Sequence, residues 1–167
     1  MTYLNLSYIY LCITLLSGCG IYSFSGASIP AETETCSINY IQNEADLIEP
    51  NLSNRLTEAL IQKCQTETDL TIVDAGSDIN FSGKIIKYEV QPIAIQNDET
   101  AAQNRLTIGV EINFISNINK TDNFTEIFTQ YADFNSNINF SEVEEMLNNL
   151  IIEEIVDDIF NKSFMNW

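Results

Sequence analysis

The stretch Arg105-Leu-Thr-Ile-Gly-Val-Glu-Ile-Asn-Phe114 alternates apolar residues with polar or small ones over its whole length. Successive side chains of a β-strand point to opposite faces, so this alternation predicts a strand with one face in the core. The inward set is Leu106, Ile108, Val110, Ile112 and Phe114, and the outward set is Arg105, Thr107, Gly109, Glu111 and Asn113. A strand with one polar face is typical of a sheet that helices cover on one side only.

Long strands are also predicted on both sides of this stretch. Residues 79–91 form the preceding strand, and their inward positions are Ile79, Phe81, Ile85, Ile86, Tyr88 and Val90. Because Ile85 and Ile86 are consecutive, the inward set changes parity there, which indicates a β-bulge. A polar turn at 117–123 leads into the following strand at 124–134.

The residues before position 79 predict a strand, a helix and a strand. Residues 36–41 alternate with a period of two, residues 51–65 have helical spacing, and residues 70–73 form a short apolar run. The apolar faces are Cys36, Ile38 and Tyr40 in the strand, and Leu52, Leu56, Ala59, Leu60 and Cys64 in the helix. This order favours a right-handed crossover between parallel strands, which would return Cys64 toward Cys36.

A C-terminal helix is predicted to begin at the capping box Ser141-Glu-Val-Glu144. Its apolar stripe is Val143, Met146, Leu147, Leu150, Ile151, Ile155, Ile159 and Phe160, and acidic residues occupy the opposite side. Two helices and several half-polar strands predict an α+β fold. We expect a two-layer sandwich with both helices packed on one face of a mixed four- to five-stranded sheet.

The N-terminus has the layout of a lipoprotein signal. An apolar run ends in Leu15-Leu-Ser-Gly-Cys19, so residues 1–18 are predicted to be a signal peptide and Cys19 the first mature, lipid-bearing residue. The alternatives are an ordinary signal peptide with an incidental cysteine, or a short membrane anchor, although the run is below the roughly 20 apolar residues of a spanning helix. Residues 19–35 would then be a lipidated tether, and residues 36–167 the folded domain.

The composition limits the partners and the chemistry. The formal net charge is −17, which repels nucleic acid and anionic headgroups, so no nucleic-acid partner is expected and the lipid has to provide membrane attachment. The chain has no histidine, the usual general base and a usual zinc ligand, and no motif pairs two carboxylates in a cleft. These observations disfavour a lipid-anchored hydrolase, and we predict no enzyme activity, no cofactor and no metal site.

Two cysteines remain once Cys12 leaves with the signal and Cys19 is acylated. Cys36 and Cys64 would lie in a compartment where disulfides persist, so a bridge between them is predicted. The alternative is two separate buried thiols.

Several motifs in order resemble the LptE family of lipopolysaccharide-assembly outer-membrane lipoproteins. They are Cys19-Gly-Ile-Tyr-Ser-Phe-Ser-Gly-Ala-Ser-Ile29, Leu56-Thr-Glu-Ala-Leu60, Phe81-Ser-Gly-Lys-Ile85, Glu99-Thr-Ala-Ala-Gln-Asn-Arg-Leu106, Ala132-Asp-Phe134 and Ile159-Phe-Asn161. The resemblance implies a lipoprotein on the periplasmic side of the outer membrane that plugs an LptD-type β-barrel and assists its assembly and lipopolysaccharide transport. The other hypothesis is a free-standing periplasmic lipoprotein that binds a small ligand or glycan.

Two groups of residues are candidate contact sites. The polar hairpin tip at 97–104 is longer than a turn needs, and loops of this kind mark either function or disorder. The family resemblance favours function, as contact with the barrel through Asn97, Asp98, Glu99, Thr100, Gln103 and Asn104. The second group is Lys84, Lys87 and Arg105, which the strand parity places on one exposed sheet face. These three either pair with Glu89 and Glu111 or form a patch for the phosphates of lipopolysaccharide.

Overall fold

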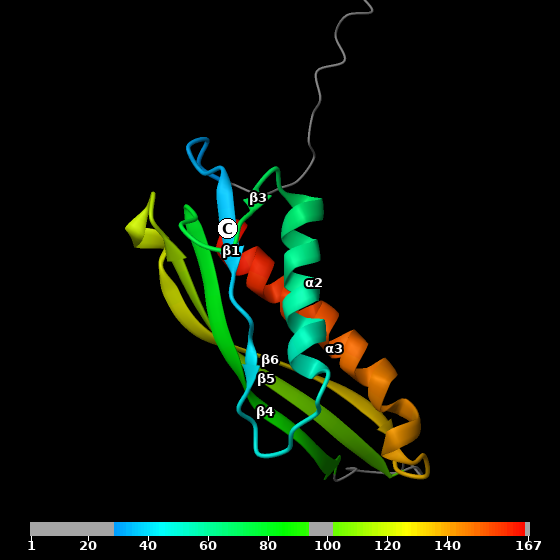
Figure 1. Ribbon diagram of the computed structural model, residues 1–167. Helices are drawn as coiled ribbons and strands as arrows, with labels where there is room; N and C mark the ends of the chain where they lie inside the picture. Colours follow the sequence, from blue (N-terminus) through cyan, green and yellow to red (C-terminus); the bar gives the residue numbers. More distant parts are fainter. Residues whose placement is uncertain (1–28, 94–101, 166–167) are drawn as a thin grey trace, which may run out of the picture.

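The computed structural model describes residues 29–93 and 102–165, which form one mixed sheet and two long helices (Figure 1). The elements are β1 (Thr35–Ile38), β2 (Gln42–Asn43), α2 (Leu52–Glu67), β3 (Thr71–Ile72), β4 (Ile79–Ile93), β5 (Gln103–Ser116), the 3₁₀ turn η1 (Lys120–Asp122), β6 (Phe124–Asn135) and α3 (Phe140–Phe164). The strand order is β3-β1-β4-β5-β6, with β2 also paired to β4. Both helices contribute to the single core on one side of the sheet, which confirms the α+β two-layer prediction.

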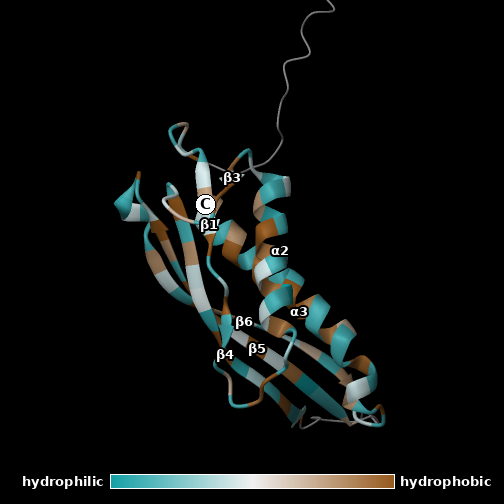
Figure 2. Cartoon of the chain, in the orientation of Figure 1, coloured by the Kyte–Doolittle hydropathy of each residue, from teal (hydrophilic) through white to brown (hydrophobic). Residues whose placement is uncertain are grey.

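Strand β5 lies between the two other long strands of the sheet, β4 and β6. All five residues of its predicted inward set are buried, and it pairs antiparallel with both β4 and β6 over nearly its whole length. Figure 2 shows that hydrophobic residues recur along the strands and along both helices, and the buried ones of these elements form a single core. The alternation in the sequence therefore predicted both the strand and the face that it buries.

The bulge in β4 is confirmed, but one of its inward residues is not. Ile85 pairs with Val110 and Lys87 pairs with Gly109, so Ile86 is the extra residue without a partner. A Cβ added to the outward-facing Gly109 would lie 3.8 Å from Ile86 Cγ1, which places Ile86 on the outer face. The prediction that Ile86 points inward was wrong, because the extra residue is accommodated on the outer side and the inward set resumes at Tyr88.

The predicted strand at 36–41 ends at Ile38, where β1 ends, and residues 39–41 are not part of a strand. The separate strand β2, which was not predicted, follows at Gln42–Asn43 and raises the sheet to six strands. At Ile41 the backbone N–H donates to the hydroxyl of Thr57 on α2 at 3.1 Å and not to β4. This bond turns the chain, so Ile41 is fully buried and Tyr40 is 54% exposed. The inward assignment of Tyr40 was therefore wrong, because a helix hydroxyl replaces the sheet partner at this point.

The strand–helix–strand unit is otherwise as predicted. Strands β1 and β3 are parallel, with Thr35 opposite Thr71, and α2 connects them through β2. The last turns of α2 reach Cys64, which is completely buried.

Helix α3 differs from its prediction at its start and along its stripe. The N-cap is Asn139, whose side chain accepts from the N–H of Ser141, so the helix begins before the expected capping box. Met146 and Leu150 are 54% and 50% exposed, whereas Ile152 and Val156 are buried. The reason is that α3 buries two sides, and Ile152 and Val156 line its groove with α2. Within the ranges described above, neither helix is long and apolar enough to cross a membrane.

The carboxylate of Asp78 joins the start of β4 to the start of β1. It accepts hydrogen bonds from the Thr35 hydroxyl at 2.7 Å and from the N–H groups of Glu34 and Thr35 at 3.0 Å each. These bonds, that of the Thr35 hydroxyl first, lower the pKa of Asp78. The charged form of Asp78 thus favours the folded state.

Replacing Asp78 with Asn should destabilise the domain most at neutral pH. A lowered folded-state pKa gives stability that is present above the ordinary pKa of Asp and is lost as the pH falls through the lowered value. Urea unfolding between about pH 7 and about pH 3 should show the difference from wild type shrinking as the pH falls. Asp74→Asn, at an exposed position of the same loop, is the matched control. A difference for Asp78→Asn that does not change with pH would contradict this role.

Candidate functional site

Some of the predicted site residues lie outside the described part of the chain, and others lie in a strand and not in a loop. Cys19, Asn97, Asp98, Glu99 and Thr100 lie outside the described residues. Gln103 and Asn104 belong to β5, where they pair with β4 on one side and with β6 on the other. The assignment of these two residues to the hairpin tip was wrong, because strand pairing extends out to Ile93 and Gln103.

Each of the three candidate basic residues has a carboxylate partner. The distances between the joined atoms are 2.9 Å for Lys84 with Glu44, 3.1 Å for Lys87 with Glu89, and 2.7 Å for Arg105 with Asp133. Glu44, and not the expected Glu111, is the direct partner of Lys84, and its hydrogen bond raises the pKa of Lys84. The Arg105 guanidinium makes a two-pronged contact and lowers the pKa of Asp133.

These basic residues share the outer face of the sheet but do not form a compact cluster. Lys84 lies opposite Glu111 and Lys87 lies opposite Gly109, both in the middle of β5, whereas Arg105 is near the start of this strand. Six residues of strand separate Glu111 from Arg105, which corresponds to roughly 20 Å. One phosphate group therefore cannot contact all three, and any anion has to compete with the carboxylate at each position.

The two predicted cysteines do meet. Cys36 on β1 and Cys64 on α2 are fully buried, and both are free thiols in this structure. A hydrogen bond with Cys36, together with burial, raises the pKa of the Cys64 thiol. Since the thiolate is the reactive form, a bridge between them would have to form during folding, before the two thiols are buried.

We propose that Cys36 and Cys64 are joined by a disulfide in the oxidised protein. Cys64→Ala should then lower the free energy of unfolding by about 2–4 kcal/mol, because the bridge no longer restricts the unfolded chain. Chemical denaturation measures this loss, and the same comparison in a reducing agent should leave only the smaller packing loss of a buried sulfur. Mass spectrometry of unreduced protein that found two free thiols would contradict the proposal.

Two of the clefts on the described part of the surface combine apolar and polar side chains in a way that bears on function. A groove of about 460 Å³ runs between α2 and α3, with Ala59, Ile152 and Val156 at its floor and Arg55 and Lys63 at its sides. Both cations are paired, with Glu145 at 3.2 Å and Asp157 at 3.0 Å respectively. Neither the groove nor any other group of the described residues gathers three side chains that would hold a metal ion.

The second cleft lies at the end of the sheet near the start of the domain. It has a volume of about 320 Å³, and aromatic side chains of Phe114, Phe124 and Phe164 form one wall. The hydroxyl of Thr33 on its lining is buried and has no hydrogen-bond partner within the described residues. This cleft therefore combines aromatic side chains with one buried hydroxyl that lacks a partner.

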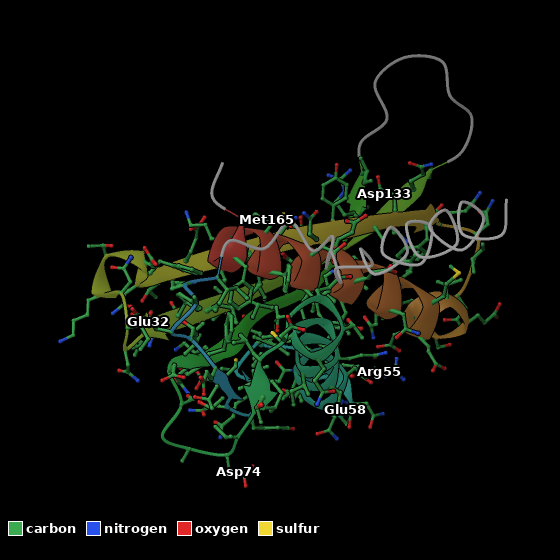
Figure 3. All side chains as sticks on the ribbon, turned by 90° about the horizontal axis from the view of Figure 1, so that it is seen from above. Glu32, Arg55, Glu58, Asp74, Asp133 and Met165 are labelled. Atoms are coloured by element: carbon green, nitrogen blue, oxygen red, sulfur yellow. The ribbon has the colours of Figure 1, made fainter. Side chains whose placement is uncertain are left out.

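The outer face of the sheet is not covered by either helix. Ile127 and Tyr131 on β6 are 56% and 50% exposed there, and the Arg105 guanidinium stacks 3.6 Å from the centroid of the Tyr131 ring. Figure 3 shows Asp133 on the side of the molecule away from Arg55 on α2. These β6 residues were not predicted as a surface feature, although Thr125, Ile127, Thr129 and Tyr131 recur with a period of two.

Comparison with known proteins gives both a family and a fold. Residues 33–163 match the family model LptE, described as lipopolysaccharide-assembly. A solved structure described as a neuraminyllactose-binding hemagglutinin homolog from Helicobacter pylori has a TM-score of 0.53 at 8% identity, covering 84% of this chain and 88% of its own. A protein of Xanthomonas campestris has a TM-score of 0.52 at 7% identity, covering 80% and 87%. No curated protein matches the sequence.

A lipoprotein B from Nitrosomonas europaea is 15% identical, with a TM-score of 0.47 over 86% of this chain and 88% of its own. At such identities the solved structures bear on the fold alone, and agree with two helices on a mixed sheet. The family match rests on the sequence itself and extends from the residues just before β1 to the last turn of α3. The chain therefore belongs to the LptE family of lipopolysaccharide-assembly proteins.

Proposed function

We propose that this protein is a non-enzymatic subunit of a lipopolysaccharide translocon. It is attached by lipid on Cys19 to the periplasmic side of the outer membrane, where it binds an LptD-type β-barrel, plugs it and assists its assembly. The observation that carries the proposal is the family match over residues 33–163. The Leu-Ser-Gly-Cys motif that ends at Cys19 supports the lipid anchor.

Affinity purification of the lipidated protein from outer membranes tests the proposal. A β-barrel should copurify in a one-to-one ratio. Cys19→Ser should release the protein into the periplasm, because the acidic surface gives no other membrane attachment. Isolation of the lipidated protein without any barrel would overturn the proposed function.

A more specific proposal is that Lys84, Lys87 and Arg105 contact the phosphates of lipopolysaccharide directly. Exchange of Lys84, Lys87 and Arg105 for Glu should abolish salt-sensitive lipopolysaccharide binding if these residues are the contact, since like charge then faces the phosphates. Isothermal titration at two salt concentrations measures this. If the residues only pair with Glu44, Glu89 and Asp133, the binding isotherm stays unchanged and the contact is excluded.

A free-standing ligand- or glycan-binding lipoprotein is the second candidate. The cleft beside Thr33, with a buried hydroxyl that lacks a partner and an aromatic wall, is the observation that favours it. Sugars commonly bind where aromatic surface and hydrogen-bonding groups meet. This candidate predicts a protein that purifies without a barrel and binds a glycan that Thr33→Val weakens.

A further inference from the structure

Strand β6 leaves one long edge of the sheet open. It pairs with β5 from Gln103 opposite Asn135 to Phe114 opposite Phe124, without a shift of register, and no strand follows it. Over residues 29–93 and 102–165, no group outside β5 forms a hydrogen bond with the backbone of residues 124–134. A row of N–H and C=O groups therefore faces outward along this strand.

The other edges of the sheet are short or protected. Strand β3 has two residues. After its two-residue pairing with β2, strand β4 has a free side that begins at the bulge at Ile86. This side carries Lys87 and Pro92, and Leu47 lines a groove next to it. Bulges, lysines and prolines are the devices by which edges resist a further strand. Strand β6 has no lysine, proline, glycine or bulge.

The side chains of β6 also suit an added strand. The six residues Ile127-Phe-Thr-Gln-Tyr-Ala132 are uncharged and rich in β-branched and aromatic residues, the composition of segments that pair readily. The charges at the two ends of this segment are already paired, because Glu126 contacts Lys162 at 3.0 Å and Asp133 contacts Arg105 at 2.7 Å. Ile127 and Tyr131 leave exposed apolar surface for the side chains of a neighbour.

We propose that β6 is the docking edge of this protein, and that it receives an extended strand of the barrel-forming partner chain. Only an extended backbone can satisfy a row of alternating donors and acceptors along a strand, so a helix or a globular surface does not fit. A second copy of this chain is disfavoured, because each copy carries a net charge of −17 and two copies repel. The inference rests on the proposed function for the identity of the partner.

Hydrogen exchange of the wild-type protein, alone and in the purified barrel complex, tests the docking edge. In a paired strand every second N–H points to each neighbour, so alternate amides of residues 125–133 should exchange at least tenfold more slowly in the complex. The amides that already point to β5 should change little. This period of two distinguishes an added strand from general burial.

A matched pair of variants gives the second readout. The double variant Ile127→Lys and Tyr131→Lys should reduce barrel copurification by about tenfold, because charges along an edge oppose strand addition. Thr107→Lys, on β5 directly opposite Tyr131, should leave copurification unchanged, since it lies one strand away from the edge. Circular dichroism and thermal unfolding establish that all variants fold.

Each outcome decides the inference. An intact complex without alternate protection in β6, or an equal loss with Thr107→Lys, overturns the docking edge and leaves the proposed function standing. Concentration-dependent self-association that protects β6 without a barrel overturns the choice of partner. Absence of any copurifying barrel overturns the proposed function and, with it, this inference.

Discussion

Phe81→Ala should lower the free energy of unfolding by about 3–5 kcal/mol, because it removes a large side chain from a closed core. Phe81 is fully buried, and its ring centroid lies 5.0 Å from that of Phe114 and 6.0 Å from that of Phe164. It therefore joins β4, β5 and the end of α3. A domain of this size has a total stability of about 5–15 kcal/mol, so the loss is a large part of the whole. Urea denaturation followed by circular dichroism measures it.

Phe124→Ala is the matched control for this prediction. Phe124 belongs to the same aromatic group, with its ring centroid 5.2 Å from that of Phe114, but it is only half-buried. Because solvent already reaches part of its surface, its removal should cost clearly less than that of Phe81. Equal losses for the two variants would show that burial of Phe81 does not hold the three elements together.

Gly83→Ala should be destabilising by about 3 kcal/mol or more, because the position has no room for a side chain. A Cβ at Gly83 would lie 2.2 Å from the carbonyl oxygen of Glu111 and 2.9 Å from Ile112 Cδ1. The nearest atom belongs to the backbone of β5, so it cannot move without disturbing the ladder. The expected result is a lower midpoint of urea denaturation with an unchanged slope.

Gly109→Ala separates close approach from the general effect of replacing a glycine. Its added Cβ would lie 3.1 Å from the Cβ of Lys87 and 3.3 Å from the hydroxyl of Thr129, so these neighbours need to give by only a few tenths of an ångström. Ala also restricts the unfolded chain, which offsets part of the cost. We expect a loss well below that of Gly83→Ala, and a comparable loss would mean that the backbone contact at Gly83 is not the cause.

The long strands show which features of the fold can be predicted from a short stretch of sequence. The inward residues of β5 and the bulge after Ile85 follow from side-chain alternation, because a strand with one buried face has to repeat with a period of two. The start of α3 shows the limit of such signals. Ser141 and Glu144 satisfy the capping pattern, yet Asn139 provides the cap two residues earlier.

Candidate contacts were harder to predict than elements. The sequence placed Lys84, Lys87 and Arg105 on one face, and the structure gives each of them an acidic partner there. It could not identify Glu44 or Asp133 as partners, because those residues come from the loop after β2 and from β6. The approach of Cys36 and Cys64 was predictable only through the assumed crossover.

The sequence by itself determined the long strands, both helices, the face that β5 buries, and a net charge that disfavours binding to nucleic acid. The tertiary structure alone decided that α3 buries Ile152 and Val156 instead of Met146 and Leu150, and that Thr57 turns Ile41 inward. It also decided which strand keeps a free edge. The physical reason is that periodicity reflects one buried side of one element. Three features depend on residues far apart along the chain. They are a second packed side of a helix, a hydrogen bond from a distant helix, and the order of the strands.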